Sequence, residues 1–253
     1  MTTVQDILTF VESIAPRDMK MEWDNVGLLC GRKDTPVTKV LVALDPFIHV
    51  CEEAADWGAQ VIVTHHPLIF HAPREITEDN ELGQSILTLC AHGISAINAH
   101  TNLDCAEGGV NDILAQTLEL KNIQTIEGQT LLRTGDFEAD LPEFLSHVKA
   151  KLGCEGLRYV SAGKPVRKVA VGGGSCAEFL RLVHDSGCDT FVTADIKYNQ
   201  FWDAKAMGIN FIDAGHFQTE NPTVAVLAEK LRVAFPEIEI KISESHADCM
   251  KYY

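Results

Sequence analysis

The stretch QVIVTHHP at residues 60–67 joins a short apolar run to two adjacent histidines and a proline. The run is continuous and rich in β-branched residues, which is typical of a strand buried on both faces of a parallel sheet. Pro67 cannot donate to the ladder of a central strand, so the strand ends near the histidines. The stretch therefore predicts a core strand that delivers His65 and His66 to one edge of a sheet.

Segments of the same kind alternate with helical patterns along the whole chain. The run KVLVALDP at 39–46 predicts another buried strand, which ends in a turn at Asp45-Pro46. This alternation indicates an α/β fold with mainly parallel sheets. Further strands are predicted at 93–101, 168–174, 190–195, 209–215 and 238–243, and helices at 7–14, 51–57, 81–92, from 108, and at 141–152, 176–186, 198–207 and 218–234.

The length of 253 residues, at roughly 150 residues per domain, predicts one large domain or two small ones. No low-complexity linker is visible, and the least patterned stretch, 127–140, is too short for a tether. We therefore expect two closely packed α/β halves, 1–127 and 128–253. VIVTHH and FVTADIKY each place a buried strand before polar residues, which leaves an internal duplication open.

The chain is acidic, with 21 Lys and Arg against 36 Asp and Glu and a formal net charge of −15. Such a field repels phosphate backbones and anionic lipid headgroups, so we expect neither nucleic acid nor a membrane as a broad partner. A small anionic ligand stays compatible, because a metal ion or a helix N-terminus can reverse the potential in one pocket. No signal or transit peptide is visible, and no apolar run approaches the ~20 residues of a membrane span, so a cytoplasmic location is expected.

The cysteines show neither CxxC spacing nor another compact metal-knuckle pattern, so they do not predict a zinc ribbon. In a reducing compartment most of them are expected to be small buried hydrophobes. Cys105 stands apart because it adjoins Asp104. The eight cysteines are Cys30, Cys51, Cys90, Cys105, Cys154, Cys176, Cys188 and Cys249.

Side chains of metal-ligand type follow several of the predicted strands. Ligands of open parallel sheets lie beyond the carboxyl ends of the strands, so these positions count more than others. Imidazole suits zinc, iron or nickel, and carboxylates supply charge and bridging oxygens. The residues at these ends are His65 and His66, His100 to Asp104, Asp195, and His216 to Glu220.

The spacing of these residues favours two metal ions over one. His216 and Glu220 share a face if a helix begins near residue 216, and the turn into Pro67 lets His65 and His66 each face a different ion. Together with Asp104 they exceed the three ligands of an open mononuclear zinc site. We therefore predict a pair of divalent ions, zinc, iron, manganese or nickel, at a site between the two halves.

Two other features have plain structural interpretations. The stretch VGGGSC at 171–176 lacks GxGxxG spacing and a Walker lysine, so a tight strand-to-helix turn is favoured over a phosphate-binding loop, although its amides leave that second interpretation open. The remaining histidines are expected at the surface or at helix caps; they are His49, His71, His92, His147, His184 and His246.

Four segments in the same order resemble one protein family: EWDNVGLLCG at 22–31, VTHHPLIF at 63–70, AHTNLDCAEGGVND at 99–112 and DAGHFQTE at 213–220. They closely resemble the Nif-three-like dinuclear-metal proteins, which are often labelled GTP cyclohydrolase type 2 homologues. The resemblance implies two intertwined, structurally similar α/β domains and a ring-shaped homohexamer. By matching motif it implies the metal ligands His65, His66, Asp104, His216 and Glu220, with His100, Trp23, Asp24 and Asn25 lining the site.

One segment departs from the family pattern. Family members usually have a histidine four residues after the aspartate of a TGD motif, whereas TADIKYNQ places Ala194 before Asp195 and Asn199 at the position of the histidine. Asn199 can form hydrogen bonds but cannot titrate near neutral pH. The cluster of ligand-type residues and the family resemblance lead us to expect metal-dependent hydrolysis of a nucleotide or related small molecule, with Glu220, Asp104 and His100 as catalytic residues. The alternative is a hexamer that stores, delivers or senses metal, or acts as a scaffold, without turnover.

Overall fold

The computed structural model describes residues 1–253, and the chain divides into two compact units. The first unit consists of Met1–Ala106 and Val224–Asp248, and the second of Glu107–Thr223 and Cys249–Tyr253. This division differs from the predicted halves, 1–127 and 128–253, at both ends. Residues 107–127 belong to the second unit, and the segment 224–248 returns to the first.

The first unit is built on a five-stranded sheet in the order β1-β4-β3-β2-β11. Its strands are β1 (Gly27–Cys30), β2 (Lys39–Ala43), β3 (Val61–Thr64), β4 (Ser95–Asn98) and β11 (Glu239–Ile242). All except β1, which runs antiparallel to β4, are parallel to their neighbours. Ile240 of β11 lies opposite Val40 of β2, and this pairing is what brings the C-terminal segment back into the first unit.

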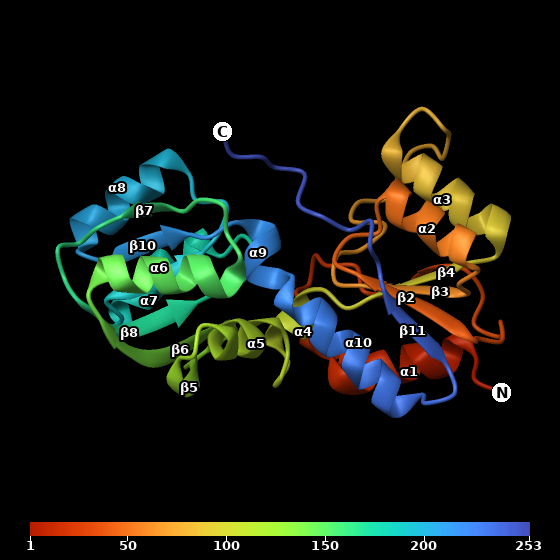
Figure 1. Ribbon diagram of the computed structural model, residues 1–253, viewed down its shortest axis with the longest axis horizontal. Coiled ribbons are helices and arrows are strands. Elements are labelled where there is room, and N and C mark those ends of the chain that lie inside the picture. The colour runs from red at the N-terminus through yellow and green to blue at the C-terminus, as the bar shows by residue number, and fades with distance from the viewer. The chain divides into compact units, whose positions relative to one another are not determined.

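Helices cover both faces of this sheet, which explains why its central strands β2 and β3 carry continuous apolar runs rather than an alternating pattern. Figure 1 shows α2 and α3 on one face and α1 and α10 on the other. Leu41 and Ile62 pack with α2 and α3 in one core cluster, while the neighbouring Val40 and Val61 are buried on the opposite face. The helices are α1 (Val4–Ile14), α2 (Ile48–Trp57), α3 (Glu81–His92) and α10 (Pro222–Ala234).

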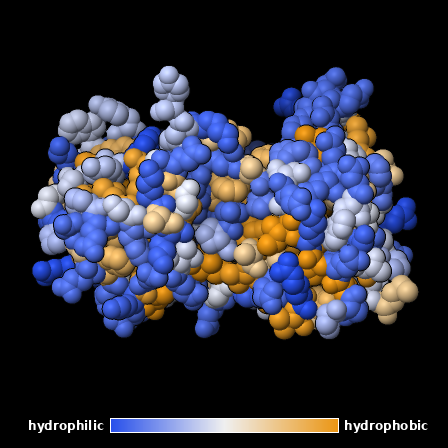
Figure 2. All heavy atoms as spheres, in the orientation of Figure 1, coloured by the Kyte–Doolittle hydropathy of each residue, from blue (hydrophilic) through white to orange (hydrophobic).

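Not all of the apolar surface of these helices is covered. Val233 in the last turn of α10 is 75 % exposed, and Figure 2 shows hydrophobic side chains gathered over this helix. No helix of the chain combines the length and the apolar character that crossing a bilayer requires.

The second unit is built on a six-stranded sheet in the order β5-β6-β8-β9-β10-β7. The three strands β8, β9 and β10 are parallel, and β5, β6 and β7 extend the sheet with antiparallel pairs. The strands are β5 (Lys121–Ile126), β6 (Gln129–Ala139), β7 (Arg158–Val160), β8 (Val166–Val171), β9 (Thr190–Thr193) and β10 (Asn210–Asp213). The helices are α5 (Val110–Thr117), α6 (Leu141–Leu152), α7 (Leu180–Asp185), α8 (Tyr198–Met207) and α9 (His216–Glu220).

The prediction of an α/β fold with mainly parallel sheets is confirmed, and three helices begin and end where the sequence predicted: 81–92, 141–152 and 198–207. Local signals explain this accuracy. The Asp140 side chain accepts a hydrogen bond from the amide of Glu143 at 2.9 Å, and Gly153 ends the same helix at φ 67°.

The stretch 127–140, the least patterned part of the sequence, contains the long strand β6. Its buried centre includes polar residues, among them Arg133, which is 3 % exposed and bonded to Asp112 of α5. A charged residue at the buried centre of a strand interrupts the hydrophobic run from which a buried strand is predicted. The edge strands β1, β5 and β7 were missed too, and the helix predicted at 218–234 is two helices, α9 and α10, with Asn221 between them.

Candidate metal centre

Three histidines converge at the carboxyl ends of β3 and β4. Thr64, the last residue of β3, lies opposite Asn98, the last residue of β4, so the segments that follow emerge side by side. The ring centroids of His65 and His66 are 4.9 Å apart, and that of His100 lies 5.2 and 5.5 Å from them. Each ring offers a nitrogen within 4.8 Å of one offered by each of the others, a spacing compatible with metal binding.

Each of these imidazoles is oriented through its Nδ1 atom. His65 Nδ1 is 2.9 Å from the carbonyl oxygen of Ala99, and His66 Nδ1 is 2.6 Å from Asp45 Oδ1. Because these oxygens only accept hydrogen bonds, Nδ1 carries the hydrogen and Nε2 carries the lone pair. This is the arrangement in which metal-ligating histidines are held in proteins.

His100 is held in the same way by a buried carboxylate. Its Nδ1 is 2.9 Å from Asp24 Oδ1, and the other oxygen of Asp24 accepts from the amide and the hydroxyl of Thr101 at 3.0 and 2.5 Å. Burial raises the pKa of Asp24, but the hydrogen bonds from His100 and Thr101 outweigh it and hold the pKa far below its ordinary value. Asp24 is therefore charged at all physiological pH values.

Asp104 completes what we call the first cluster: His65, His66, His100 and Asp104. It lies on the short helix α4 (Thr101–Cys105), which the sequence did not predict and which follows β4 directly. The amide of Asp104 donates to the carbonyl of His100 at 3.0 Å, and this turn places the buried Asp104 Oδ1 3.7 Å from His65 Nε2. Three nitrogen donors and one carboxylate thus come from one sheet edge.

The second cluster consists of His216, Glu220 and Asp195 and lies in the second unit. His216 Nε2 is 3.1 Å from Glu220 Oε2, because the two residues are one turn apart in α9. Asp195 follows β9, the parallel neighbour of β10, and its Oδ2 is 2.7 Å from His216 Nδ1. Glu220 is 3 % exposed, so its charge faces little solvent.

The electrostatics of the second cluster favour a cation. Burial lowers the pKa of His216, but hydrogen bonds and charges of Asp195 and Glu220 outweigh it and raise the pKa to about 11. The hydrogen bond from His216 in turn lowers the pKa of Asp195. The protonated ring of His216 thus donates one N–H to each of two carboxylates, and a divalent cation would be stabilised by the same negative charges.

The glycine run at 172–174 shapes the second cluster. A Cβ atom on Gly174, whose φ is +59°, would lie 2.2 Å from Glu220 Oε1 and 2.9 Å from His216 Nε2. The amides of Gly173 and Gly174 donate to Asn111 Oδ1 at 2.7 Å and Thr219 Oγ1 at 3.0 Å. Because these amides bond within the protein, the tight-turn interpretation holds and the phosphate-loop interpretation does not.

Asp45 and Asn199 were not among the predicted site residues. Asp45 was interpreted only as part of a turn, yet it orients His66; its place at the end of a buried strand was the signal that would have found it. Asn199, at the position where the family pattern has a histidine, is exposed in the first turn of α8.

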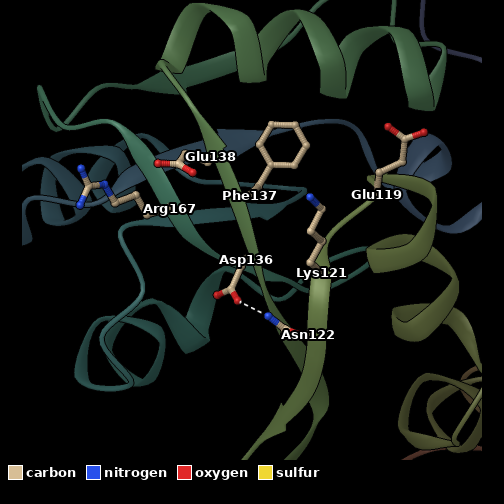
Figure 3. A pocket seen from close by; sticks show the side chains of 7 residues that line it. All are labelled: Glu119, Lys121, Asn122, Asp136, Phe137, Glu138 and Arg167. Atoms are coloured by element: carbon tan, nitrogen blue, oxygen red, sulfur yellow. Dashed lines mark hydrogen bonds between the residues drawn. The ribbon is translucent and has the colours of Figure 1, made fainter.

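A surface cavity of about 730 Å³ in the second unit includes none of the predicted site residues (Figure 3). It lies beside the β5–β6 hairpin, and a hydrogen bond of 2.7 Å joins Asn122 to Asp136 across it. Its lining residues are Glu119, Lys121, Asn122, Asp136, Phe137, Glu138 and Arg167. The cavity therefore does not bear on the metal centre.

The fold and the clusters define an α/β protein with imidazole and carboxylate groups gathered at the carboxyl ends of parallel strands. The family model described as Duf34/NIF3 (NGG1p interacting factor 3) matches residues 2–249, and the chain belongs to this family. The resemblance inferred from the four sequence motifs is thereby confirmed.

Known relatives match over nearly the whole chain. Two relatives are named GTP cyclohydrolase 1 type 2 homolog, one from Clostridium perfringens and one from Clostridium acetobutylicum, and each is 33 % identical to this chain. Each match covers 98 % of this chain, and the matches cover 99 % and 98 % of the two relatives. The crystal structure of the Bacillus cereus protein related to NIF3 matches with a TM-score of 0.93 and 25 % identity, over 100 % of this chain and 99 % of that one. Reduced HcgD from Methanocaldococcus jannaschii matches with a TM-score of 0.85 and 29 % identity, over 96 % and 98 %.

Proposed function

We propose that the two clusters supply one dinuclear metal centre, with His65, His66, Asp104, His216 and Glu220 as the ligands of two divalent ions. The observation that carries the proposal is the common orientation of the imidazoles, each of which presents Nδ1 to a carbonyl or carboxylate oxygen. Oxygen partners on Nδ1 make Nε2 the metal-binding atom and raise its basicity. The mixture of imidazole and carboxylate suits zinc, iron, manganese or nickel.

We further propose that the centre hydrolyses a nucleotide or a related small molecule. A pair of bound divalent ions lowers the pKa of a coordinated water and polarises the substrate. The support for a planar substrate is the aromatic rim of the first cluster: Trp23 is 63 % and Phe70 45 % exposed, and their ring centroids are 5.7 Å apart. Both rings lie about 6 Å from that of His100, at 6.2 and 6.1 Å, where they can stack on a base.

The residues of the chain divide the remaining work. Asp104 and Glu220 are buried carboxylates that would hold the ions and would supply negative charge beside them. His100, whose Nδ1 is held by Asp24, can hold or donate a proton through Nε2 at the substrate. Asp24 keeps the His100 ring in one orientation through the reaction.

The alternative function is metal storage, delivery or sensing, or a scaffold, by a hexamer without turnover. Asn199 favours it, because the titratable histidine of the family pattern is replaced there by a residue that cannot transfer a proton near neutral pH. Either function includes the proposed hexamer, which predicts a mass in solution near six times 27.8 kDa by light scattering.

The test uses the full chain, stripped by a chelator and reloaded with zinc, manganese, iron or nickel. We expect about two ions per chain by elemental analysis, and turnover of at least one member of a panel of nucleotides and phosphoesters. The Glu220→Gln variant should lose kcat/KM by at least 100-fold, on the order of 3 kcal/mol of transition-state stabilisation, whereas exposed Glu155→Gln should not.

Each outcome separates the proposals. Full turnover in Glu220→Gln would contradict the hydrolytic mechanism, and a single ion per chain would contradict the dinuclear centre. Two tightly held ions with no turnover of any panel member would support the non-catalytic alternative.

A further inference from the structure

Two cysteines far apart in sequence are in contact on the surface of the first unit. Cys30 ends the strand β1 and Cys90 lies in the C-terminal part of α3, and their Sγ atoms are 3.8 Å apart. Both are thiols in this structure. Nothing in the metal centre uses either of them.

The two thiols differ in accessibility in a way that suits a two-step reaction. Cys90 is exposed and Cys30 is half-buried against the core cluster of α2 and α3. Burial is the main cause that raises the pKa of the Cys30 thiol to about 11, and the neighbouring Cys90 is the second. Cys90 is therefore the sulfur that meets a reagent from solvent first, and Cys30 is the neighbour that can react with the product.

The backbone around Cys30 can accommodate a bond between the two sulfurs. A disulfide needs a sulfur separation of about 2.05 Å, so the atoms have to approach by roughly 1.8 Å. β1 is an edge strand, and Leu28 lies opposite Ile97 while Cys30 lies opposite the adjacent Ala96, which makes a bulge. An edge strand with a bulge has unpaired backbone on one side and shifts more readily than a central strand.

We propose that Cys30 and Cys90 are a reversible redox-modification site that forms an intramolecular disulfide when the protein meets a peroxide. The Cys90 thiolate attacks one peroxide oxygen, the O–O bond breaks, and Cys90 becomes a sulfenic acid as hydroxide leaves. The Cys30 sulfur, on losing its proton, then attacks the Cys90 sulfur, and the second oxygen leaves as water. In total two thiols and one hydrogen peroxide give one disulfide and two waters, and a small thiol restores both cysteines.

The crosslink would tie β1 to α3 within the first unit. β1 follows the segment that contains Asp24 and Asn25, and the Asn25 side chain donates to the carbonyl of Ile69 at 2.7 Å. A crosslink across the 59 residues between the cysteines restricts the unfolded chain, so oxidation should raise the midpoint of thermal unfolding by about 5 °C.

The test treats the full-length metal-loaded protein with hydrogen peroxide at a few equivalents, blocks remaining thiols with an alkylating reagent, and digests without reduction. We expect the loss of two of the eight thiols and a peptide pair joined through Cys30 and Cys90, both reversed by a small thiol. Cys90→Ser should abolish the crosslink and the shift in the unfolding midpoint. Cys249→Ser, at an exposed cysteine of the C-terminal segment, should leave both unchanged.

Three outcomes would overturn the proposal. They are sulfinic or sulfonic acid at Cys90 without a crosslink, a disulfide from Cys90 to a second copy of the chain, and a loss of two thiols in Cys90→Ser as large as that in the unmodified chain. Cys30→Ala is a second variant and should show a Cys90 sulfenic acid that a dimedone-type reagent traps.

Discussion

The first and second clusters contain the same residue types, but they differ in the ratio of imidazoles to carboxylates and in the protonation of the imidazoles. In the first cluster three imidazoles outnumber one carboxylate, and two of the rings are held by Ala99 and Asp45 with the lone pair on Nε2. In the second a single imidazole lies between two carboxylates, and its pKa is raised to about 11. The same residue types thus offer neutral nitrogen donors in the first cluster. In the second cluster they form a negatively charged environment that holds a protonated histidine.

The two clusters also differ in how the backbone supports them. The first cluster is held in place by hydrogen bonds such as that between the His100 and Asp24 side chains, and by a turn of α4. The second cluster contacts the backbone of Gly174, where no space remains for a side chain. The first unit depends in addition on a segment that returns from the far end of the chain, while the second is nearly continuous. Substitutions in the two units test these differences.

Gly174→Ala should destabilise the second unit by about 3 kcal/mol, because the new methyl group meets Glu220 and the backbone is strained for any residue with a Cβ. Metal binding should weaken in parallel as Glu220 is displaced. Urea unfolding measures the first effect and calorimetric titration the second. The control is Gly163→Ala, with φ +70° and nothing within 4 Å, where only about 1 kcal/mol of strain is expected. Equal losses in the two variants would show that crowding at Glu220 is unimportant.

Glu53→Gln should cost about 2 kcal/mol at neutral pH and should act on the first unit. The Glu53 carboxylate accepts hydrogen bonds from the hydroxyl of Ser243 at 2.6 Å and the amides of Glu244 and Ser245, which hold the returning segment. Burial raises the pKa of Glu53, but these bonds and that from Lys241 lower it from 4.5 to about 2.

The sign of the pH dependence follows from this lowered pKa. The stabilisation by Glu53 is present above pH 4.5 and is lost as the pH falls from 4.5 to about 2. Unfolding free energies measured across this window should fall less steeply in Glu53→Gln than in the unmodified chain. Glu52→Gln, at an exposed neighbour, should keep the original slope. Parallel slopes in all three proteins would rule out this role for Glu53.

Asp45→Asn should weaken metal binding about tenfold, because the amide no longer fixes the Nδ1–H tautomer of His66. Asp195→Asn should have a smaller net effect. It removes the corresponding partner of His216 but also lowers the pKa of that histidine, so that a proton competes less with the metal. Calorimetric titration of both variants, with exposed Asp56→Asn as the control, measures the difference. A larger loss in Asp195→Asn than in Asp45→Asn would reverse the comparison.

The sequence predicted those parts of the fold where local and global signals agree. Helix 81–92 was predicted to the residue because Asn80 caps it and Gly93 ends it at φ 65°. β6 was missed because Arg133 occupies its buried centre, where the ion pair with Asp112 and hydrogen bonds to backbone carbonyls make the charge tolerable. The division between the units was misplaced because the pairing of β11 with β2 joins residues about 200 positions apart.

Periodicity and short motifs are local properties of the chain, so the amino-acid sequence was enough to identify the α/β class, the family, and the imidazole and carboxylate groups at the strand ends. Only the folded chain shows which nitrogen of His65 and His66 carries the lone pair, why Gly174 has to be glycine, and which thiols are in contact. Those properties depend on contacts such as His66 with Asp45 and Cys30 with Cys90, whose partners lie 21 and 60 residues apart. No local pattern encodes such contacts, because they form only when strands and helices pack.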